Sequence, residues 1–148
     1  MPDAASNLDQ ELNQAIAKLC ADSGTIHVKD GDELVLHLVA SCNVPPGVVD
    51  AIREVPWGKG MAGLAAQREE PADYCDIQSS TSPDIHPLAR ASGVRGAVVV
   101  PMMNGTEVVG TIGIGSRNER TFSAQEIRWL LAFGRRLAND FREDRMAA

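Results

Sequence analysis

The sequence predicts an α+β domain with a helix near each end of the chain and an antiparallel sheet between them. Two segments, one near the N-terminus and one after residue 123, repeat apolar residues at helical spacing. Between them lie two pairs of strand-like segments, joined at Asp30-Gly31 and at Asn104-Gly105, dipeptides typical of hairpin turns. No internal repeat or linker interrupts the 148 residues, so we expect a single domain over residues 1–148.

The first helix is expected within residues 1–21. Ser6, followed by Asp9 three residues later, is the expected N-terminal cap, and Ser23-Gly24 the expected stop. The apolar residues of this segment recur on one helical face: Leu8, Leu12, Ile16 and Leu19.

Residues 24–115 are expected to supply the sheet and the segments around a pocket. In the first hairpin, Thr25–Lys29 alternates, with Ile26 and Val28 on one face and Thr25, His27 and Lys29 on the other. We interpret His27 and His37 as surface or edge residues. The second hairpin spans Arg95–Gly115, and its valine run predicts a strand buried on both faces.

Shorter elements are expected between the two hairpins. They are a short helix over Gly47–Val55, another over Met61–Arg68, a short strand over Pro71–Ile77, a loop from Gln78 to Pro87 and a short helix over Pro87–Ser92.

The last helix is expected over residues 123–144. Ser123 and Glu126 have the spacing of a capping box, in which each side chain accepts a backbone hydrogen bond from the other residue. One stripe of this helix is apolar: Ile127, Leu130, Leu131, Leu137 and Phe141.

A glycine-rich turn at Trp57-Gly-Lys-Gly-Met61 leads directly into a helix of small residues. Gly58 and Gly60 tolerate positive φ, which permits a sharp turn. The first amides of such a helix have no partner inside it, and the helix dipole favours an anion there. The turn therefore predicts a pocket wall, with Trp57 as an aromatic side; the alternative, that it only packs with Trp57 as a core anchor, remains open.

Composition excludes several classes of function. The net charge of −6 argues against a nucleic-acid-binding surface. The longest apolar run, Ala97–Met103, is far too short to span a membrane, and no secretory signal precedes it, so we expect a cytoplasmic protein. Cys20, Cys42 and Cys75 are odd in number and widely spaced, so we expect free thiols and neither a disulfide framework nor a metal site.

The order of these pieces resembles a GAF domain, a small-molecule sensor module of signalling proteins. The matching segments include Gly24–Asp30 with its hairpin, Gly58–Ala66, Gly93–Pro101, Gly105–Ile114 and Phe122–Ile127. The resemblance implies a GAF/PAS-like antiparallel sheet of five to six strands, with the terminal helices on one face and a ligand pocket on the other. By position, it implies these ligand-binding residues: Trp57, Gly60, Met61, Ala62, Tyr74, Asp76, Ile77, Ile85 and His86.

The function that this resemblance implies is that of a non-catalytic sensor or regulatory domain that binds a small molecule. The ligand and any cofactor are not identified by the sequence. Stand-alone GAF proteins that sense nitrate are similar in size and in the glycine turn, so a small anion such as nitrate is the named candidate. We expect a homodimer through the terminal helices, a separate signalling partner, and no contact with nucleic acid or membrane.

The alternatives come from other branches of the family or from another class of function. A thiol-dependent free methionine-R-sulfoxide reductase needs pocket cysteines, but Met61 stands where one belongs and only Cys75 is near. Haem binding would rest on His86 alone. A bilin site lacks its Cys-His pair, and the cyclic-nucleotide signature is matched at Asn118 and Phe122 only. A structural dimerisation module also remains open.

Overall fold

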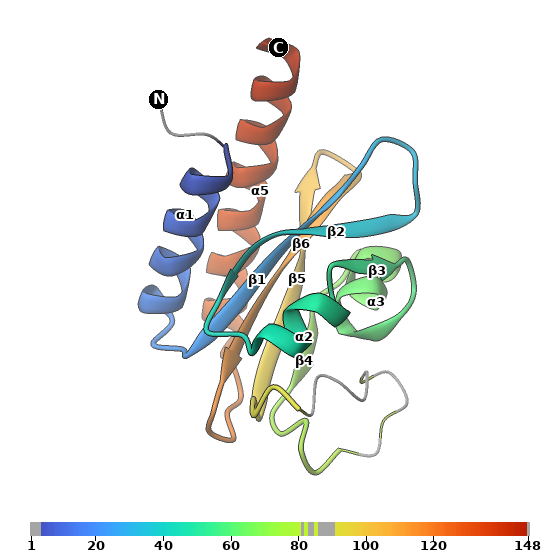
Figure 1. Ribbon diagram of the computed structural model, residues 1–148. Coiled ribbons are helices and arrows are strands. Elements are labelled where there is room, and N and C mark those ends of the chain that lie inside the picture. Colours follow the sequence, from blue (N-terminus) through green and yellow to red (C-terminus); the bar gives the residue numbers. More distant parts are fainter. Residues whose placement is uncertain (1–3, 81, 83–84, 86–90, 148) are drawn as a thin grey trace.

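The computed structural model describes residues 4–80, 82, 85 and 91–147, and its centre is a six-stranded antiparallel sheet of order β3-β2-β1-β6-β5-β4 (Figure 1). In chain order the elements are α1 (Ala4–Lys18), β1 (Ser23–Lys29), β2 (Val35–Cys42), α2 (Pro46–Ala51), β3 (Glu54–Pro56), α3 (Gly60–Arg68), β4 (Ala72–Tyr74), β5 (Gly96–Asn104), β6 (Glu107–Ser116) and α5 (Ala124–Ala147).

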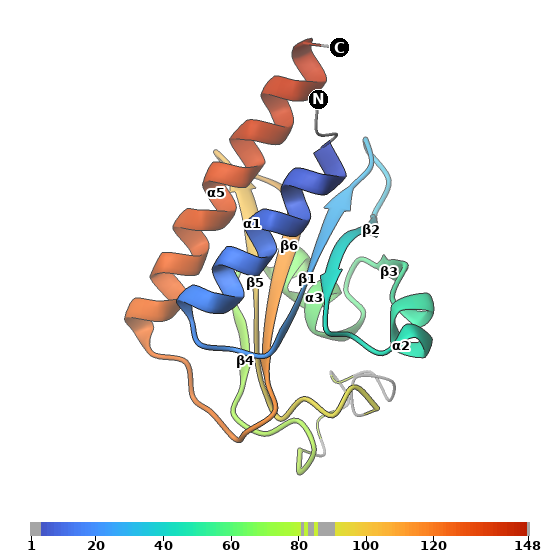
Figure 2. The same cartoon turned by 60° about the vertical axis from the view of Figure 1, so that its left-hand side comes forward.

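The helices divide between the two faces of the sheet. α1 and α5 lie side by side over one face, which we call the terminal-helix face, and α2 and α3 lie over the other (Figures 1 and 2). This arrangement confirms the expected α+β fold, with a sheet of five to six strands and both terminal helices on one side.

The sheet is assembled from the two predicted hairpins. β1 pairs with β2, and β5 pairs with β6 around the turn at Gly105, which has a φ of 64°. β1 also pairs with β6, with Ile26 opposite Ile112, and this pairing joins the hairpins into one sheet. β1 and β6 are therefore the central strands, and helices lie over both of their faces.

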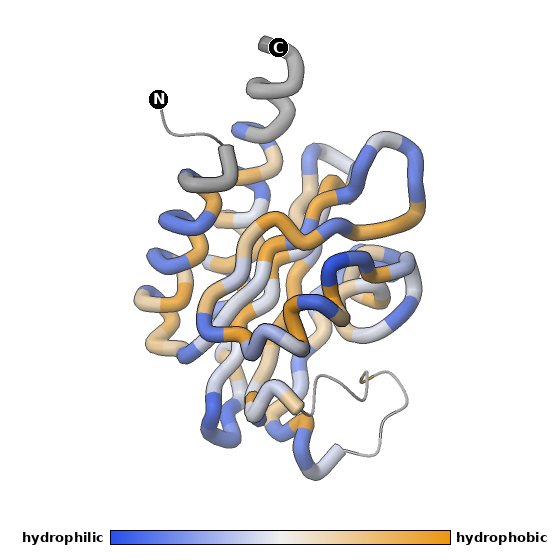
Figure 3. The backbone as a smooth tube through the Cα atoms, in the orientation of Figure 1, coloured by the Kyte–Doolittle hydropathy of each residue, from blue (hydrophilic) through white to orange (hydrophobic). Residues whose placement is uncertain are grey.

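The main core fills the space between the sheet and the two terminal helices. Leu12 of α1, Leu130 of α5, and Ile26, Val100 and Ile112 of the sheet are fully buried there. Apolar residues gather on the strands and on the inner sides of the helices (Figure 3). The helical stripes of the sequence are thus core stripes, because each meets the apolar face of the sheet.

α1 differs from its prediction at both ends. It begins at Ala4, so Ser6 lies inside the helix and is not its N-cap. It ends at Lys18, because Cys20 takes a left-handed conformation with φ 53° and the amide of Ala21 donates to the carbonyl of Ile16. This closure is a Schellman-type helix end made without glycine, so no residue preference predicts it.

The short elements also differ from their predictions. The helix expected over Gly47–Val55 stops at Ala51, and an unpredicted edge strand, β3, follows it and pairs with β2. The strand expected over Pro71–Ile77 is only Ala72–Tyr74. Most of the helix expected over Pro87–Ser92 lies outside the described residues.

α5 follows its prediction closely and runs slightly past it, to Ala147. Its capping box is formed: the amide of Ser123 donates to Glu126 Oε1 over 2.8 Å, and the amide of Glu126 donates to Ser123 Oγ over 3.0 Å. Among the helices of the described ranges, none combines the length and the apolar composition needed to cross a membrane.

Candidate functional site

The sheet face beneath α2 and α3 contains two adjoining cavities. The first, of about 150 Å³, we call the loop cavity; the second, of about 210 Å³, we call the helix cavity. Their shared wall is formed by Thr25, Ile52, Met61 and Val99. This is the face on which the GAF resemblance implies a pocket.

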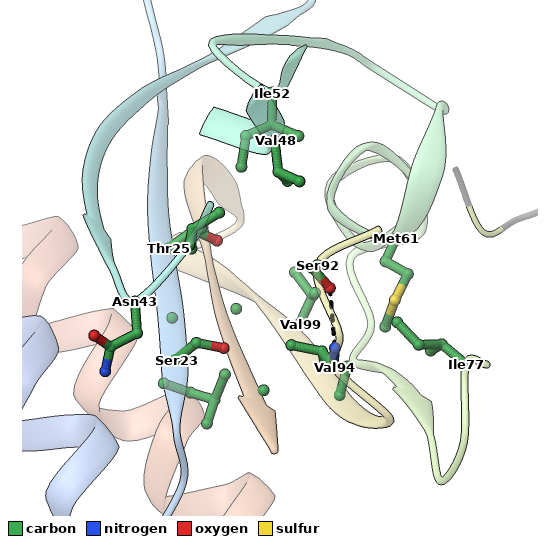
Figure 4. Close-up of a pocket in the computed structure, with 16 residues that line it drawn as sticks. Ser23, Thr25, Asn43, Val48, Ile52, Met61, Ile77, Ser92, Val94 and Val99 are labelled. Atoms are coloured by element: carbon green, nitrogen blue, oxygen red, sulfur yellow. Dashed lines mark hydrogen bonds between the residues drawn. The ribbon is translucent and has the colours of Figure 1, made fainter. Parts of the chain in front are cut away.

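The loop cavity lies between β1, α2 and the segment that leads into β5 (Figure 4). Ser23 and Thr25 of β1 form its floor, and Val48 of α2 lies across from them. Ile77 closes one side, next to Met61. Most of the lining is apolar, so the two hydroxyls of β1 are among its few polar groups.

The helix cavity is bounded by the N-terminus of α3, at Lys59–Ala62, and by His27 of β1. Gly60 has a φ of 64°, which only glycine adopts without strain. The first i→i−4 bond of α3 runs from the Gly63 amide to the Lys59 carbonyl, and no side chain caps the helix. The amides of Gly60, Met61 and Ala62, which precede this bond, have no acceptor within the helix and lie at the positive end of its dipole.

His27 is 2% exposed, which corrects the expectation that it lies at a surface or an edge. Its strand is central, so the polar face of β1 is covered by α2. The His27 Nε2 lies 2.9 Å from the carbonyl oxygen of Ile52. A carbonyl only accepts, so Nε2 carries the proton and Nδ1, which has no partner in the described part of the chain, is an acceptor.

The imidazole of His27 is held in its neutral form. Burial is the main cause and lowers the pKa of His27 below its ordinary value, and the nearby His37 lowers the pKa further. The hydrogen bond to the Ile52 carbonyl opposes this by favouring the charged ring. Since burial dominates, the ring beside the cavity is neutral, and its Nδ1 is itself buried.

The comparisons with known proteins identify the fold family. The family model described as GAF domain matches residues 5–139. This chain belongs to the GAF domain family. GAF domains are generally sensor or regulatory domains. A search of curated proteins finds no match.

Solved structures similar to this GAF domain share its fold at low sequence identity. They include the GAF domain of an Acinetobacter phosphoenolpyruvate-protein phosphotransferase, with a TM-score of 0.80 and 19% identity over 97% of this chain and 84% of that one. A domain of a putative two-component sensor histidine kinase protein from Sinorhizobium meliloti has a TM-score of 0.77 and 16% identity over 97% and 94%. A free methionine-R-sulfoxide reductase from Neisseria meningitidis, in complex with its substrate, has a TM-score of 0.79 and 19% identity over 99% of this chain and 82% of that one.

Four of the residues that the sequence predicted for ligand binding line the cavities. Gly60 and Ala62 line the helix cavity, Ile77 lines the loop cavity and Met61 lines both. The structure thus brings the start of α3 and one residue of the following loop to a common space, as their positions in the GAF fold imply.

The other predicted site residues lie elsewhere. Trp57 packs in a separate core cluster with Leu36 and Ala66, and Lys29 Nζ lies 5.7 Å from the centre of its ring. Tyr74 and Ile85 pack against Ile77 and Ala97 behind the loop cavity. His86 lies outside the described residues.

Asp76 is occupied with the loop itself. Its Oδ2 accepts from Arg95 over 2.9 Å and from Ser79 over 3.0 Å, and its Oδ1 accepts from the amide of Gln78. Desolvation would raise the pKa of Asp76, but the hydrogen bonds from Ser79 and Gln78 and the charge of Arg95 outweigh it and lower the pKa. In this structure the carboxylate holds the loop to the start of β5.

Sequence reasoning missed the polar residues of the cavity floor, Ser23, Thr25 and His27. The alternation of polar and apolar residues along this strand was visible. Its meaning changes only once the strand is known to be central, because the polar side of a central strand faces the interior and not water.

The cysteines lie away from both cavities. Cys20 and Cys75 are exposed, Cys42 is partly buried, and none of the three contributes to the lining of either cavity. Among the described residues, no group of three or more His, Cys, Asp or Glu side chains is placed to hold a metal ion. The polar side chains of the two linings are therefore hydroxyls, the amide of Asn43, the imidazole of His27 and one charge of each sign, on Glu54 and Lys59.

Proposed function

We propose that this GAF domain binds a small molecule in the helix and loop cavities and acts as a regulatory domain in signal transduction, without a catalytic step of its own. The observation that carries the proposal is the N-terminus of α3, which has no side-chain cap and forms part of the wall of a cavity of about 210 Å³. Binding pockets are typically apolar hollows with a few convergent polar groups.

A small anion such as nitrate is one candidate for the helix cavity. The amides of Gly60, Met61 and Ala62 offer three donors to an anion, and the helix dipole adds a partial positive charge. The exposed Lys59 at the cavity rim adds a full positive charge. The carboxylate of Glu54 also lines this cavity and opposes an anion, so the candidate requires that the three amides and Lys59 outweigh it.

A methionine-R-sulfoxide reductase is the second candidate, since two similar structures carry that name. The position of the cysteines argues against it, because a thiolate must reach the bound substrate and no thiol lines either cavity. Activity on free methionine-R-sulfoxide that disappears in Cys75→Ser, but survives in Cys20→Ser, would favour the reductase over the sensor.

The output of the domain would pass through α1 and α5. An ion pair joins the two helices: the guanidinium of Arg136 in α5 lies 2.6 Å from Oε2 of Glu11 in α1. We propose that two copies of the chain form a homodimer through these helices. A ligand in the cavity shifts the arrangement of the helices only to the extent that it binds one arrangement more tightly than the other. Sedimentation equilibrium measures whether the protein is a dimer, and repeating it with ligand measures whether binding changes the dimerisation constant.

The test of the proposal is a thermal-shift screen in which the cavities are blocked by mutation. The screen covers nitrate, other small anions, amino acids, cyclic nucleotides and haem. A ligand at a hundred times its dissociation constant stabilises by about 2.7 kcal/mol, which raises the melting temperature by several degrees. We expect Met61→Trp to abolish the shift, because Met61 lines both cavities.

Gln125→Trp is the control, since it places the same bulky side chain at an exposed position of α5, on the other side of the sheet from the cavities. It should keep the full shift. A shift that survives Met61→Trp would place the ligand outside the cavities, and no shift with any compound would favour a structural dimerisation module.

A further inference from the structure

The connection between β6 and α5, residues 117–123, runs along the end of the molecule where α1 ends and where the chain leaves β4 (Figure 2). Arg120 lies in this connection, and its side chain is partly buried, with 21% exposed. It lines neither the loop cavity nor the helix cavity. Its backbone and its side chain form hydrogen bonds with different parts of the fold, and those parts are distant from one another in the chain.

The backbone of Arg120 is bonded to the segment that follows β4. Its amide donates to the carbonyl of Cys75 over 2.9 Å. Two positions further on, the side chain of Ile77 lines the loop cavity, and the amide of Ile77 donates to the carbonyl of Arg95 over 2.7 Å. We call Cys75–Gln78 the cavity-edge segment. The backbone of Arg120 is therefore attached to the segment that borders the loop cavity.

The side chain of Arg120 is bonded to the end of α1. One guanidinium nitrogen donates to the carbonyl of Cys20 over 3.2 Å, and another donates to the carbonyl of Leu19 over 2.5 Å. Arg120 and Cys20 are 100 positions apart in the chain. The last carbonyls of a helix have no partner inside it and lie at the negative end of its dipole, so a guanidinium is favourable there.

The same guanidinium is bonded to the start of α5. It donates to Glu126 Oε2 over 2.6 Å, while Glu126 Oε1 accepts from the amide of Ser123 in the capping box. The hydrogen bond from the Ser123 amide is the main cause that lowers the pKa of Glu126; Arg120 lowers the pKa further, and burial opposes both. The guanidinium also lies 4.3 Å from the ring centre of Phe122, which is buried in the main core. Arg120 thus joins the end of α1 to the start of α5.

The start of β5 packs directly against Arg120. A Cβ added to Gly96 would lie 2.8 Å from the Cβ of Arg120 and 2.9 Å from its carbonyl oxygen. The amide of Gly96 also donates to the carbonyl of Asn118 over 3.1 Å. Glycine at this position lets the two backbones lie in contact. Arg120 is therefore held between β5 and the cavity-edge segment, and a shift of either one reaches its backbone.

We propose that Arg120 is a positioning residue that couples the cavity-edge segment to the ends of α1 and α5. When the cavity-edge segment loosens, the Arg120 amide loses its acceptor at Cys75, and the guanidinium is no longer fixed at the carbonyls of Leu19 and Cys20. Coupling of this kind is a free energy shared between two places, so it acts in both directions. The inference goes beyond the proposed function, because it concerns the protein without any ligand.

The experiment is amide hydrogen exchange, measured by NMR, on a double-mutant cycle of Asp76→Ala and Arg120→Ala. Asp76→Ala removes the carboxylate that holds the cavity-edge segment. We expect it to speed the exchange of the Leu19 and Ala21 amides, which close α1, by about five-fold, equivalent to about 1 kcal/mol. In Arg120→Ala these amides should already exchange faster, and adding Asp76→Ala should change them no further.

Two further variants separate coupling from a general loss of stability. Arg120→Lys keeps the positive charge and loses the planar fork, so it should retain part of the response of Leu19 and Ala21 to Asp76→Ala. Arg117→Ala is the matched control, since it removes an exposed arginine from the same connection, and it should leave that response whole. The amide of Ile112, at the centre of the sheet, should exchange slowly in every variant.

The outcome that would overturn the inference is additivity. If Asp76→Ala speeds the exchange of Leu19 and Ala21 equally with and without the Arg120 side chain, Arg120 only stabilises its surroundings. An effect of Asp76→Ala that stays within the cavity-edge segment would overturn the inference as well. Ligand binding is measured separately by the thermal-shift screen, so failure of the coupling leaves the sensor proposal standing, and failure of the screen leaves the coupling standing.

Discussion

The two faces of the sheet are built from the same strands and differ in almost every respect. On the terminal-helix face, Ile26, Val100 and Ile112 contact α1 and α5 in a fully buried apolar core. On the other face the neighbouring residues are Thr25, Val99 and Thr111, and cavities remain beneath α2 and α3. Departures from good packing are expected at functional sites, so the contrast supports the proposed site beneath α2 and α3.

The largest expected difference between the faces is the cost of truncating a buried side chain. Leu130→Ala truncates a fully buried side chain of α5 on the terminal-helix face and should lower the free energy of unfolding by about 2–5 kcal/mol. Val99→Ala, at the wall of both cavities, should cost about 1 kcal/mol, because its surroundings are already partly empty. Urea denaturation of both variants measures the difference, and equal losses would show that the two faces are packed alike.

A smaller difference is expected between the two helix N-termini. Ser123 caps α5, and Ser123→Ala should destabilise the protein by about 1 kcal/mol because the amide of Glu126 loses its acceptor. Lys59 at the start of α3 makes no capping bond, so Lys59→Ala should change stability very little. A loss as large for Lys59→Ala as for Ser123→Ala would contradict an open α3 terminus.

The smallest expected effect is a pH dependence that comes from His27. Its pKa is lowered in the folded state, so below about pH 6.5 the unfolded chain binds the proton more readily than the folded chain. Stability should therefore fall as the pH drops from 7.5 to 5.5. His27→Gln should flatten this slope, whereas His37→Gln, on the partly exposed neighbouring histidine, should retain most of it. Urea midpoints across the pH range give the comparison, and an unchanged slope in His27→Gln would exclude the neutral buried ring.

Much of the fold follows from local signals in the sequence. The Ser123–Glu126 box, the Asn104-Gly105 turn and the apolar stripes of α1 and α5 each act over a few residues, and each is confirmed. The end of α1 at Lys18 was not predictable, because it is closed by a left-handed residue at Cys20, a position where glycine or asparagine is the usual signal.

The candidate site was predicted less completely, since it depends on contacts between distant segments. Gly60, Met61 and Ala62 were found through the chemistry of a helix N-terminus, which is local. His27 was placed at the surface because its burial depends on the pairing of β1 with β6, more than 80 positions along the chain from it, and on Ile52 above it. Trp57 was expected at the pocket and lies in a neighbouring core cluster.

The most direct test of the account is an NMR titration with the compound that gives the largest thermal shift. We expect the amide resonances of Gly60, Met61 and Ala62 to move most, together with that of Thr25, while exposed positions of α1 such as Gln14 stay in place. Changes concentrated on α1 and α5, with Gly60–Ala62 unmoved at saturation, would contradict a ligand site beneath α2 and α3.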